Sequence, residues 1–210
     1  MAIMPMFPLG STMMPGSLLR LHVFEPRYRA LMEHVLAQPE QEFGVVLIAR
    51  GSEVGGGDQR LEVGSVAQVL ESARSDDGRY GVLAGMGRRI RVREWLADDP
   101  YPQADVEDWR DDPADTVGAE ELEDLTRRTR RAMLISEELG DPSRDHGVRL
   151  SDDPTVLTYQ LAGLAPIGDL DRYELLRAPG AGARARRLGE MLTELEPVFR
   201  FRLTGGNDPQ

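Results

Sequence analysis

The sequence predicts an α+β protein in which a β-barrel precedes a helical unit. Short apolar runs separated by turn residues recur at near-even spacing up to residue 109, which is typical of a barrel. Near residue 110 the composition becomes acidic and poor in apolar residues, and beyond it apolar residues recur at helical spacing. We therefore expect the barrel over residues 1–112, the helices over residues 113–204 and a frayed tail over residues 205–210.

Two strands and a helix are expected first. Ile3 to Leu9 and Leu18 to Phe24 are short apolar runs, and the Pro15-Gly16 pair between them indicates a turn. Pro26 suits the first turn of a helix, where a missing N–H costs nothing. The apolar residues that follow it have helical spacing, and Pro39 ends the pattern.

Four more strands are expected over residues 43–50, 61–73, 80–96 and 102–109. The first is a continuous apolar run, which favours a strand covered on both faces. Gly64 suggests a bulge or bend in the second strand. Asp77-Gly78 is a hairpin signal between the second and the third. Residues 51–58 are glycine-rich and are predicted to form a loop.

The second half of the chain predicts helices. Leu122, Leu125, Met133 and Leu139 mark one amphipathic face, and a loop over residues 140–154 follows. Asp153 is placed to cap the next helix, with Pro154 at its first position. Two short helices are expected over residues 155–179, and a last helix over residues 181–203.

Composition excludes several kinds of chemistry. The chain has no cysteine, so disulfides, thiolate metal sites and cysteine nucleophiles are absent. It also has no lysine, which excludes a Walker A motif and a Ser–Lys dyad. We expect no metal and no cofactor. The formal net charge of -11 argues against a nucleic-acid partner. No apolar run is long enough to cross a membrane and the N-terminus lacks a signal-peptide pattern, so we expect a cytoplasmic protein.

Several segments together resemble the Lon protease N-terminal (substrate-binding) domain family. They are FPLGSTMMPGSLLRLHVFEPRYRALM, EFGVVLIARGSEVG, VGSVAQVLE, DDGRYGVLAGMGRRIRV, YPQADVE and LTYQLAGLAPIGDLDRYELLRAPGAGARARRLGEML. The resemblance implies a PUA-like mixed β-barrel followed by a C-terminal helical bundle. In full-length Lon proteases this module touches polypeptide substrates and helps assembly, and the AAA+ ATPase and Ser–Lys peptidase come later. The chain stops where that module stops, so we expect a stand-alone bacterial protein of this type.

The candidate binding residues are Met13, Met14, Phe24, Arg27 and Tyr28, together with Asp171, Arg172 and Tyr173. We expect the two methionines to be exposed at the Pro-Gly turn, where a flexible, polarizable side chain suits binding of varied apolar partners. The structural alternative for the region is a local ion pair between Glu25 and Arg27 with Tyr28 packed beneath it. No residue of the chain is predicted to be catalytic.

Three functions remain in competition. The first is a non-catalytic module that holds an unfolded polypeptide or a partner protein, by apolar contact and strand pairing, in a groove between barrel and bundle. The second is a hydrolase with an unrecognised site, which should show a deep pocket of converging titratable residues. The third is RNA binding through Arg88, Arg89, Arg91 and Arg93, although a solvated strand face explains the same residues. Residues 180–185, GAGARA, fit a dinucleotide pattern but follow a helix instead of a strand, so we reject them as a nucleotide site. The partner and the oligomeric state stay open.

Overall fold

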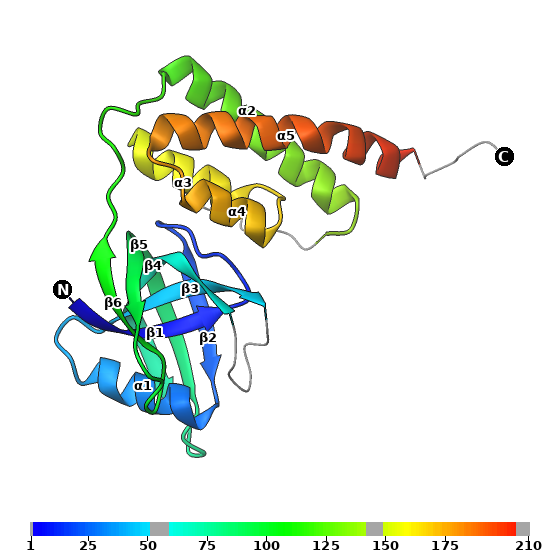
Figure 1. The fold of residues 1–210 in the computed structure, drawn as a ribbon. Coiled ribbons are helices and arrows are strands. Elements are labelled where there is room, and N and C mark those ends of the chain that lie inside the picture. Colours follow the sequence, from blue (N-terminus) through cyan, green and yellow to red (C-terminus); the bar gives the residue numbers. More distant parts are fainter. Residues whose placement is uncertain (1, 51–58, 142–148, 205–210) are drawn as a thin grey trace. The chain divides into compact units, whose positions relative to one another are not determined.

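The computed structural model describes residues 2–50, 59–141 and 149–204 (Figure 1). The chain divides into two compact units, Met1–Arg110 and Asp111–Gln210, and each is considered by itself. In the described residues the first unit holds six strands and one helix, and the second holds four helices. The predicted loop over residues 51–58, residues 142–148 of the second predicted loop and the predicted tail over residues 205–210 lie outside the described residues.

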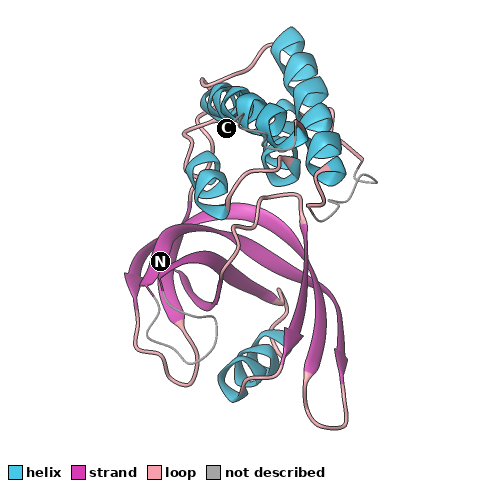
Figure 2. Cartoon of the chain, turned by 90° about the vertical axis from the view of Figure 1, so that its right-hand side faces the viewer, coloured by secondary structure: helices cyan, strands magenta, loops and turns pink. Residues whose placement is uncertain are grey.

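The strands of the first unit form one mixed sheet. The elements are β1 (Ala2–Leu9), β2 (Leu18–Val23), α1 (Pro26–Leu36), β3 (Glu42–Arg50), β4 (Gln59–Arg74), β5 (Tyr80–Trp95) and β6 (Gln103–Asp108). The strand order is β2-β5-β4-β3-β1-β6, and β6 also pairs with β5. The pairings therefore run in a ring through β5, β4, β3, β1 and β6, while β2 lies outside it. Strands β1 and β3 are parallel and the other pairs are antiparallel. Figure 2 shows the strong curvature of the sheet.

Local signals account for much of this sheet. The run from Phe43 to Leu47 is buried, as expected for a strand covered on both faces. Gly78 has φ +79° in the turn between β4 and β5, a conformation that glycine adopts without cost. A Cβ on Gly64 would lie 2.0 Å from the Val45 carbonyl oxygen, so the missing side chain lets β3 and β4 approach closely.

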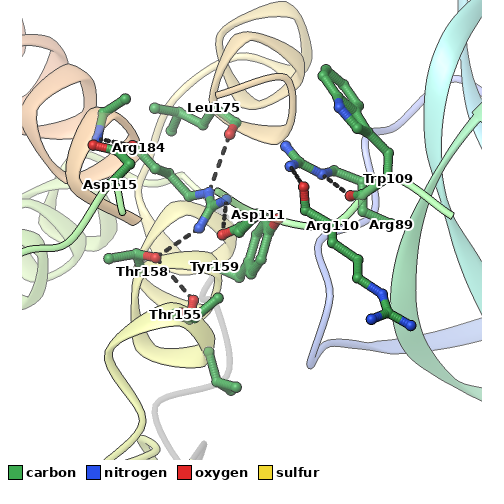
Figure 3. A network of polar contacts seen from close by, with 12 residues as sticks. Arg89, Trp109, Arg110, Asp111, Asp115, Thr155, Thr158, Tyr159, Leu175 and Arg184 are labelled. Carbon is green, nitrogen blue, oxygen red and sulfur yellow. Dashed lines mark hydrogen bonds and ion pairs between the residues drawn. The ribbon is translucent and has the colours of Figure 1, made fainter. Parts of the chain in front are cut away.

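Strand β5 has a bulge at the first of its arginines. Ser65 of β4 is opposite Arg89 and Ala67 is opposite Met86, so Gly87 and Arg88 together are opposite one residue. Arg89 lies on the same face of the sheet as its partner Ser65, opposite to the buried Ile90, and is only 4% exposed. Its Nε donates to the Trp109 carbonyl oxygen at 2.9 Å (Figure 3). The predicted fully solvated arginine face is therefore wrong at Arg89.

The second unit consists of α2 (Ala119–Glu138), α3 (Pro154–Leu164), α4 (Asp169–Leu176) and α5 (Ala181–Leu203). The Asp153 side chain accepts hydrogen bonds from the N–H groups of Thr155 and Val156, and Pro154 occupies the first turn, so the predicted cap is confirmed. The long helices α2 and α5 pack along each other, with α3 against both. Whether these helices form the expected bundle stays a prediction.

A buried arginine organises the core of the second unit (Figure 3). Arg184 of α5 is 0% exposed, and its Nη2 lies 2.8 Å from Oδ2 of Asp111. Its other donors bond the Leu175 carbonyl oxygen and the Thr158 hydroxyl, and the guanidinium stacks 3.4 Å over the Tyr159 ring. The Tyr159 hydroxyl donates to Oδ1 of Asp111. Each of the three guanidinium nitrogens thus has a hydrogen-bond acceptor within this unit.

The glycines of the GAGARA segment have a packing role. A Cβ on Gly180 would lie 2.8 Å from Cβ of Asp115, and a Cβ on Gly182 would lie 2.4 Å from the Thr116 carbonyl oxygen. Asp115 also accepts a hydrogen bond from the Ala183 N–H in the first turn of α5. The glycines therefore let residues 112–116 lie against the start of α5, which is consistent with rejecting a nucleotide site.

Candidate binding site

The first unit contains a pocket of about 380 Å³ beside β2. Its walls come from Phe7 and Leu9 of β1, from residues 19–23 of β2, and from the start of α1. Ser11 and Met13, in the connection between β1 and β2, complete the lining. All of these segments lie within the first 28 residues, so one short stretch of chain builds the pocket.

The floor of the pocket is apolar and closely packed. The ring of Phe7 stacks on the ring of Tyr28 with centroids 4.1 Å apart, and both side chains are buried. Leu9, Leu19 and Val23 belong to the same buried cluster. An apolar side chain of a ligand would therefore meet an apolar surface here.

The corner between β2 and α1 forms the rim. Nε of Arg27 lies 3.1 Å from Oε2 of Glu25, and the Arg27 guanidinium is 4.4 Å from the centroid of the Tyr28 ring. The expected local ion pair over a packed tyrosine is therefore confirmed. Phe24 at this corner is 52% exposed, so a large apolar side chain is held at the edge of the pocket.

Strand β2 has one unpaired edge. In the described chain it pairs with β5 and with no other strand. The Met86 N–H donates to the Ser17 carbonyl oxygen at 2.8 Å, which sets the alternation of the ladder. Residues 19, 21 and 23 therefore face β5 with their backbone groups, whereas those of Leu18, Arg20 and His22 point away from it. This free edge is a template for another strand.

The wall of the pocket formed by β1 offers no such free edge for strand pairing. The Met6 N–H donates to the Pro102 carbonyl oxygen, so Met6 directs its backbone groups away from β3. Strand alternation gives Pro8 the same direction. Pro8 has no N–H, so this part of β1 can supply a carbonyl but no donor. A chain entering the pocket would thus find a complete ladder only along β2.

Residues 3–194 match the family model described as the ATP-dependent protease La (LON) substrate-binding domain. The chain belongs to this family. The Lon protease of Anaeromyxobacter dehalogenans (strain 2CP-C) is 30% identical over 204 residues, and Lon protease 2 of Herpetosiphon aurantiacus is 24% identical over 193 residues. These alignments cover 95% and 91% of this chain but 24% of each relative. The chain therefore spans about a quarter of the length of the curated relatives that it matches.

Solved structures from the Lon family have the same fold. One is titled as the crystal structure of a Lon N-terminal domain protein from Xanthomonas campestris, with a TM-score of 0.67 and 24% identity over 92% of this chain and 98% of that one. Another, the N-terminal domain of a Mycobacterium avium complex Lon protease, has a TM-score of 0.62 and 15% identity over 92% of this chain and 99% of that one. At these sequence identities, the comparison with the two structures shows a shared fold alone.

The structure brings together part of the predicted binding set. Met13, Phe24 and Tyr28 line the pocket, and Arg27 lies beside it. The expected exposure of Met14 is wrong, since it is 2% exposed, and Met13 is half-buried against the core of the first unit. A turn explains this, because the Ser17 N–H and hydroxyl both donate to the Met14 carbonyl oxygen and leave Pro15 and Gly16 at the tip.

The predicted residues on α4 belong to the second unit and serve its own structure. Oδ2 of Asp171 accepts the Gly168 N–H at the start of the helix. Arg172 is buried, and it bonds Oδ1 of Asp169 at 3.0 Å and the Ala165 carbonyl oxygen at 3.1 Å. Burial lowers the pKa of the Arg172 guanidinium, and Asp169 opposes that change. Tyr173 is also buried, so a binding role for this segment stays a prediction.

The arginines of β5 are already engaged within the first unit. Arg88 lies 2.7 Å from Glu42 and 2.9 Å from Asp108, and Arg93 pairs with Glu107. Arg89 and Arg91 both stack on Trp109. Because these guanidinium groups have carboxylate or aromatic partners, the geometry gives the RNA hypothesis no support.

Two general features complete the description. Within residues 2–50, 59–141 and 149–204, no helix is both long and apolar enough to cross a membrane. Over the same residues, His, Cys, Asp and Glu side chains form no group of three that could hold a metal ion.

The sequence did not single out Arg20 and His22 of β2 or Pro8 of β1 as neighbours of the pocket. Only the strand pairing reveals that β1 and β2 are not hydrogen-bonded to each other there.

Proposed function

We propose that the first unit binds an extended segment of an unfolded polypeptide or of a partner protein as an added strand on β2. The observation that carries this proposal is the free β2 edge beside an apolar pocket. Backbone pairing at such an edge supplies affinity for many sequences, and the pocket selects apolar side chains at alternate positions. Membership of a substrate-binding domain family supports the same role.

The lining of the pocket favours binding over hydrolysis. Its titratable residues are Arg20, His22, Glu25 and Tyr28; Glu25 is paired with Arg27, and the Tyr28 ring is stacked on Phe7. A hydrolytic site needs a nucleophile or a bound water held by a base that a third group orients. Ser11 also lines the pocket, but among the described residues no hydrogen bond joins Ser11 to His22 or His22 to Glu25, so the arrangement is not assembled. We therefore propose a module that holds chains without cutting them.

The test changes a single outward backbone donor. Arg20→Pro removes an N–H that points away from β5 and leaves the β2–β5 ladder intact, whereas Arg20→Ala removes the side chain and keeps the donor. Binding of a fluorescent, extended peptide with leucine at alternate positions is measured by anisotropy. One lost strand hydrogen bond predicts roughly threefold to tenfold weaker binding for Arg20→Pro relative to Arg20→Ala.

The apolar part of the site has its own variants. Met13→Asp is expected to weaken binding of the same peptide, because it places a charge at the rim of the pocket. Thermal unfolding of each variant shows that the fold is kept. Equal affinity of Arg20→Pro and Arg20→Ala would exclude strand addition at β2, and unchanged binding by Met13→Asp would exclude the pocket.

A further inference from the structure

A second groove lies on the helical unit, along the outward face of α2. Its volume is about 660 Å³, and its apolar lining comes from Leu122, Leu134 and Ile135 of α2 and from Leu157 of α3. Leu134 is 56% exposed, which is unusual for a large aliphatic side chain that has three further apolar residues around it. Nothing in the strand-addition proposal uses this surface.

Basic side chains border the apolar groove. Arg127, Arg130 and Arg131 line it, with Glu123 as the one carboxylate in the lining, and Arg127 pairs with Asp124 of the same helix. For Arg130 and Arg131, no carboxylate of a described residue lies within ion-pair distance. These two guanidinium groups are therefore available to a ligand, on a protein whose formal net charge is -11.

The lining residues of α2 form one continuous face of that helix. Residues 127, 130, 131 and 134 follow the i, i+3, i+4, i+7 pattern of one helix face. From Leu122 to Ile135 the helix rises about 20 Å, which is the length of about four helical turns. A groove bounded by α2 and by Leu157 of the adjacent α3 presents the surface into which an amphipathic helix packs.

We propose that this groove is a docking site for an acidic amphipathic helix of a partner protein. Aliphatic side chains of the partner would pack on Leu134 and Leu157, and its carboxylates would reach Arg130 and Arg131. Charge complementarity selects this occupant, because a basic or neutral helix would leave the two arginines without an acceptor. The site is independent of the β2 edge and so extends the function beyond capture of extended chains.

The experiment uses the full chain and a labelled helical peptide of about 16 residues, long enough to match the groove. The peptide carries leucines on one face and glutamates beside them, and a second peptide has glutamine in place of each glutamate. We expect the glutamate peptide to bind at least fivefold more tightly and to weaken as salt is raised. Equal binding of the two peptides, or binding of neither, would overturn the proposal.

Matched variants locate the site. Arg130→Glu is expected to weaken binding of the glutamate peptide about tenfold, whereas Arg177→Glu, an equal charge change at the C-cap of α4, is expected to leave it unchanged. Leu134→Asp should abolish binding, whereas Leu170→Asp, at a leucine that is 65% exposed on α4, should not. If Arg130→Glu and Arg177→Glu behave alike, the groove is not the site.

Two further measurements separate helix docking from strand addition and from binding of nucleic acid or lipid. Arg20→Pro should leave the helical peptide bound, so failure of strand addition and failure of helix docking are read independently. Oligouridylate and vesicles containing phosphatidylglycerol serve as competitors, because both present anionic groups that arginine binds. Arg130-dependent binding of either competitor, in the absence of peptide binding, would assign the groove to that ligand and reject the helical partner.

Discussion

The single side chain of Arg184 forms hydrogen bonds with three segments of the helical unit that are distant in sequence. The guanidinium joins α5 to α3 through Thr158, to the end of α4 through the Leu175 carbonyl oxygen, and to Asp111 ahead of α2. Burial of an arginine costs several kcal/mol unless its donors are matched, and here they are. The network therefore favours one arrangement of these segments within the helical unit.

Removal of this side chain should be far more costly than removal of an exposed neighbour. Arg184→Ala removes the guanidinium donors to Asp111 and Thr158 and the buried side chain itself, and we expect a loss of about 3–5 kcal/mol in the free energy of unfolding. Arg187→Ala, on the same helix, breaks exposed pairs with Glu174 and Glu190 and should cost less than about 1 kcal/mol. Urea denaturation followed by circular dichroism measures both, and similar losses would contradict the assigned role.

Individual residues were the least predictable part of the molecule. The Glu25–Arg27 pair could be anticipated because its partners are neighbours in sequence. The burial of Arg184 could not, since its partners Asp111 and Thr158 are 73 and 26 residues away. Met14 was misplaced because the sequence shows a Pro-Gly turn without showing which flanking residue points inward.

Elements were far more predictable, because their signals are local. The last helix coincides with its expected range, 181–203, and the hairpin at Gly78 and the cap at Asp153 follow from single residues with specific backbone preferences. Strand pairing has no such local signal. The pairings through β5, β4, β3, β1 and β6, and the position of β2 outside them, emerge only from the register, and the expected barrel stays a prediction.

The cap of α3 provides a test at the level of an element. Oδ1 of Asp153 accepts N–H groups that the helix itself leaves unpaired, so Asp153→Ala should lower the free energy of unfolding by about 1 kcal/mol. Asp152→Ala removes the adjacent, exposed carboxylate and should change it by less than about 0.5 kcal/mol. Chemical denaturation of the two variants side by side checks this, and an equal response would remove the capping assignment.

At the scale of the whole molecule, the helical unit extends beyond its helices. Residues 111–118 carry Asp111, which holds Arg184, and Asp115, which bonds the first turn of α5. We expect a fragment of residues 111–203 to unfold cooperatively. A fragment of residues 119–203 retains all four helices but leaves the buried Arg184 without its Asp111 carboxylate, at a cost comparable with the stability of a small domain.

Thermal melts of the two fragments, together with the dispersion of their amide proton resonances, give the comparison. The longer fragment should show a sharp transition and dispersed resonances. The shorter should retain helical circular dichroism with a broad transition and poor dispersion. Equal cooperativity in the two fragments would mean that residues 111–118 contribute little to the fold of the helical unit.

The order of strands and helices and the family of the chain were both accessible from sequence, because they depend on patterns that extend over most of its length. The candidate site was accessible in part. Met13, Phe24 and Tyr28 could be named, but the pocket depends on a seam between strands that are hydrogen-bonded to other partners. The groove on α2 was not anticipated, since its leucines read as an ordinary amphipathic face.

Pro8 has a kinetic consequence. A peptide strand added to β2 would be hydrogen-bonded along one edge alone. On its other side, Pro8 of β1 offers a carbonyl oxygen but no N–H. Differences in affinity among related complexes arise chiefly in the rate of dissociation. A half-formed ladder of this kind favours short residence times, so a captured polypeptide would be released and recaptured repeatedly instead of being stored.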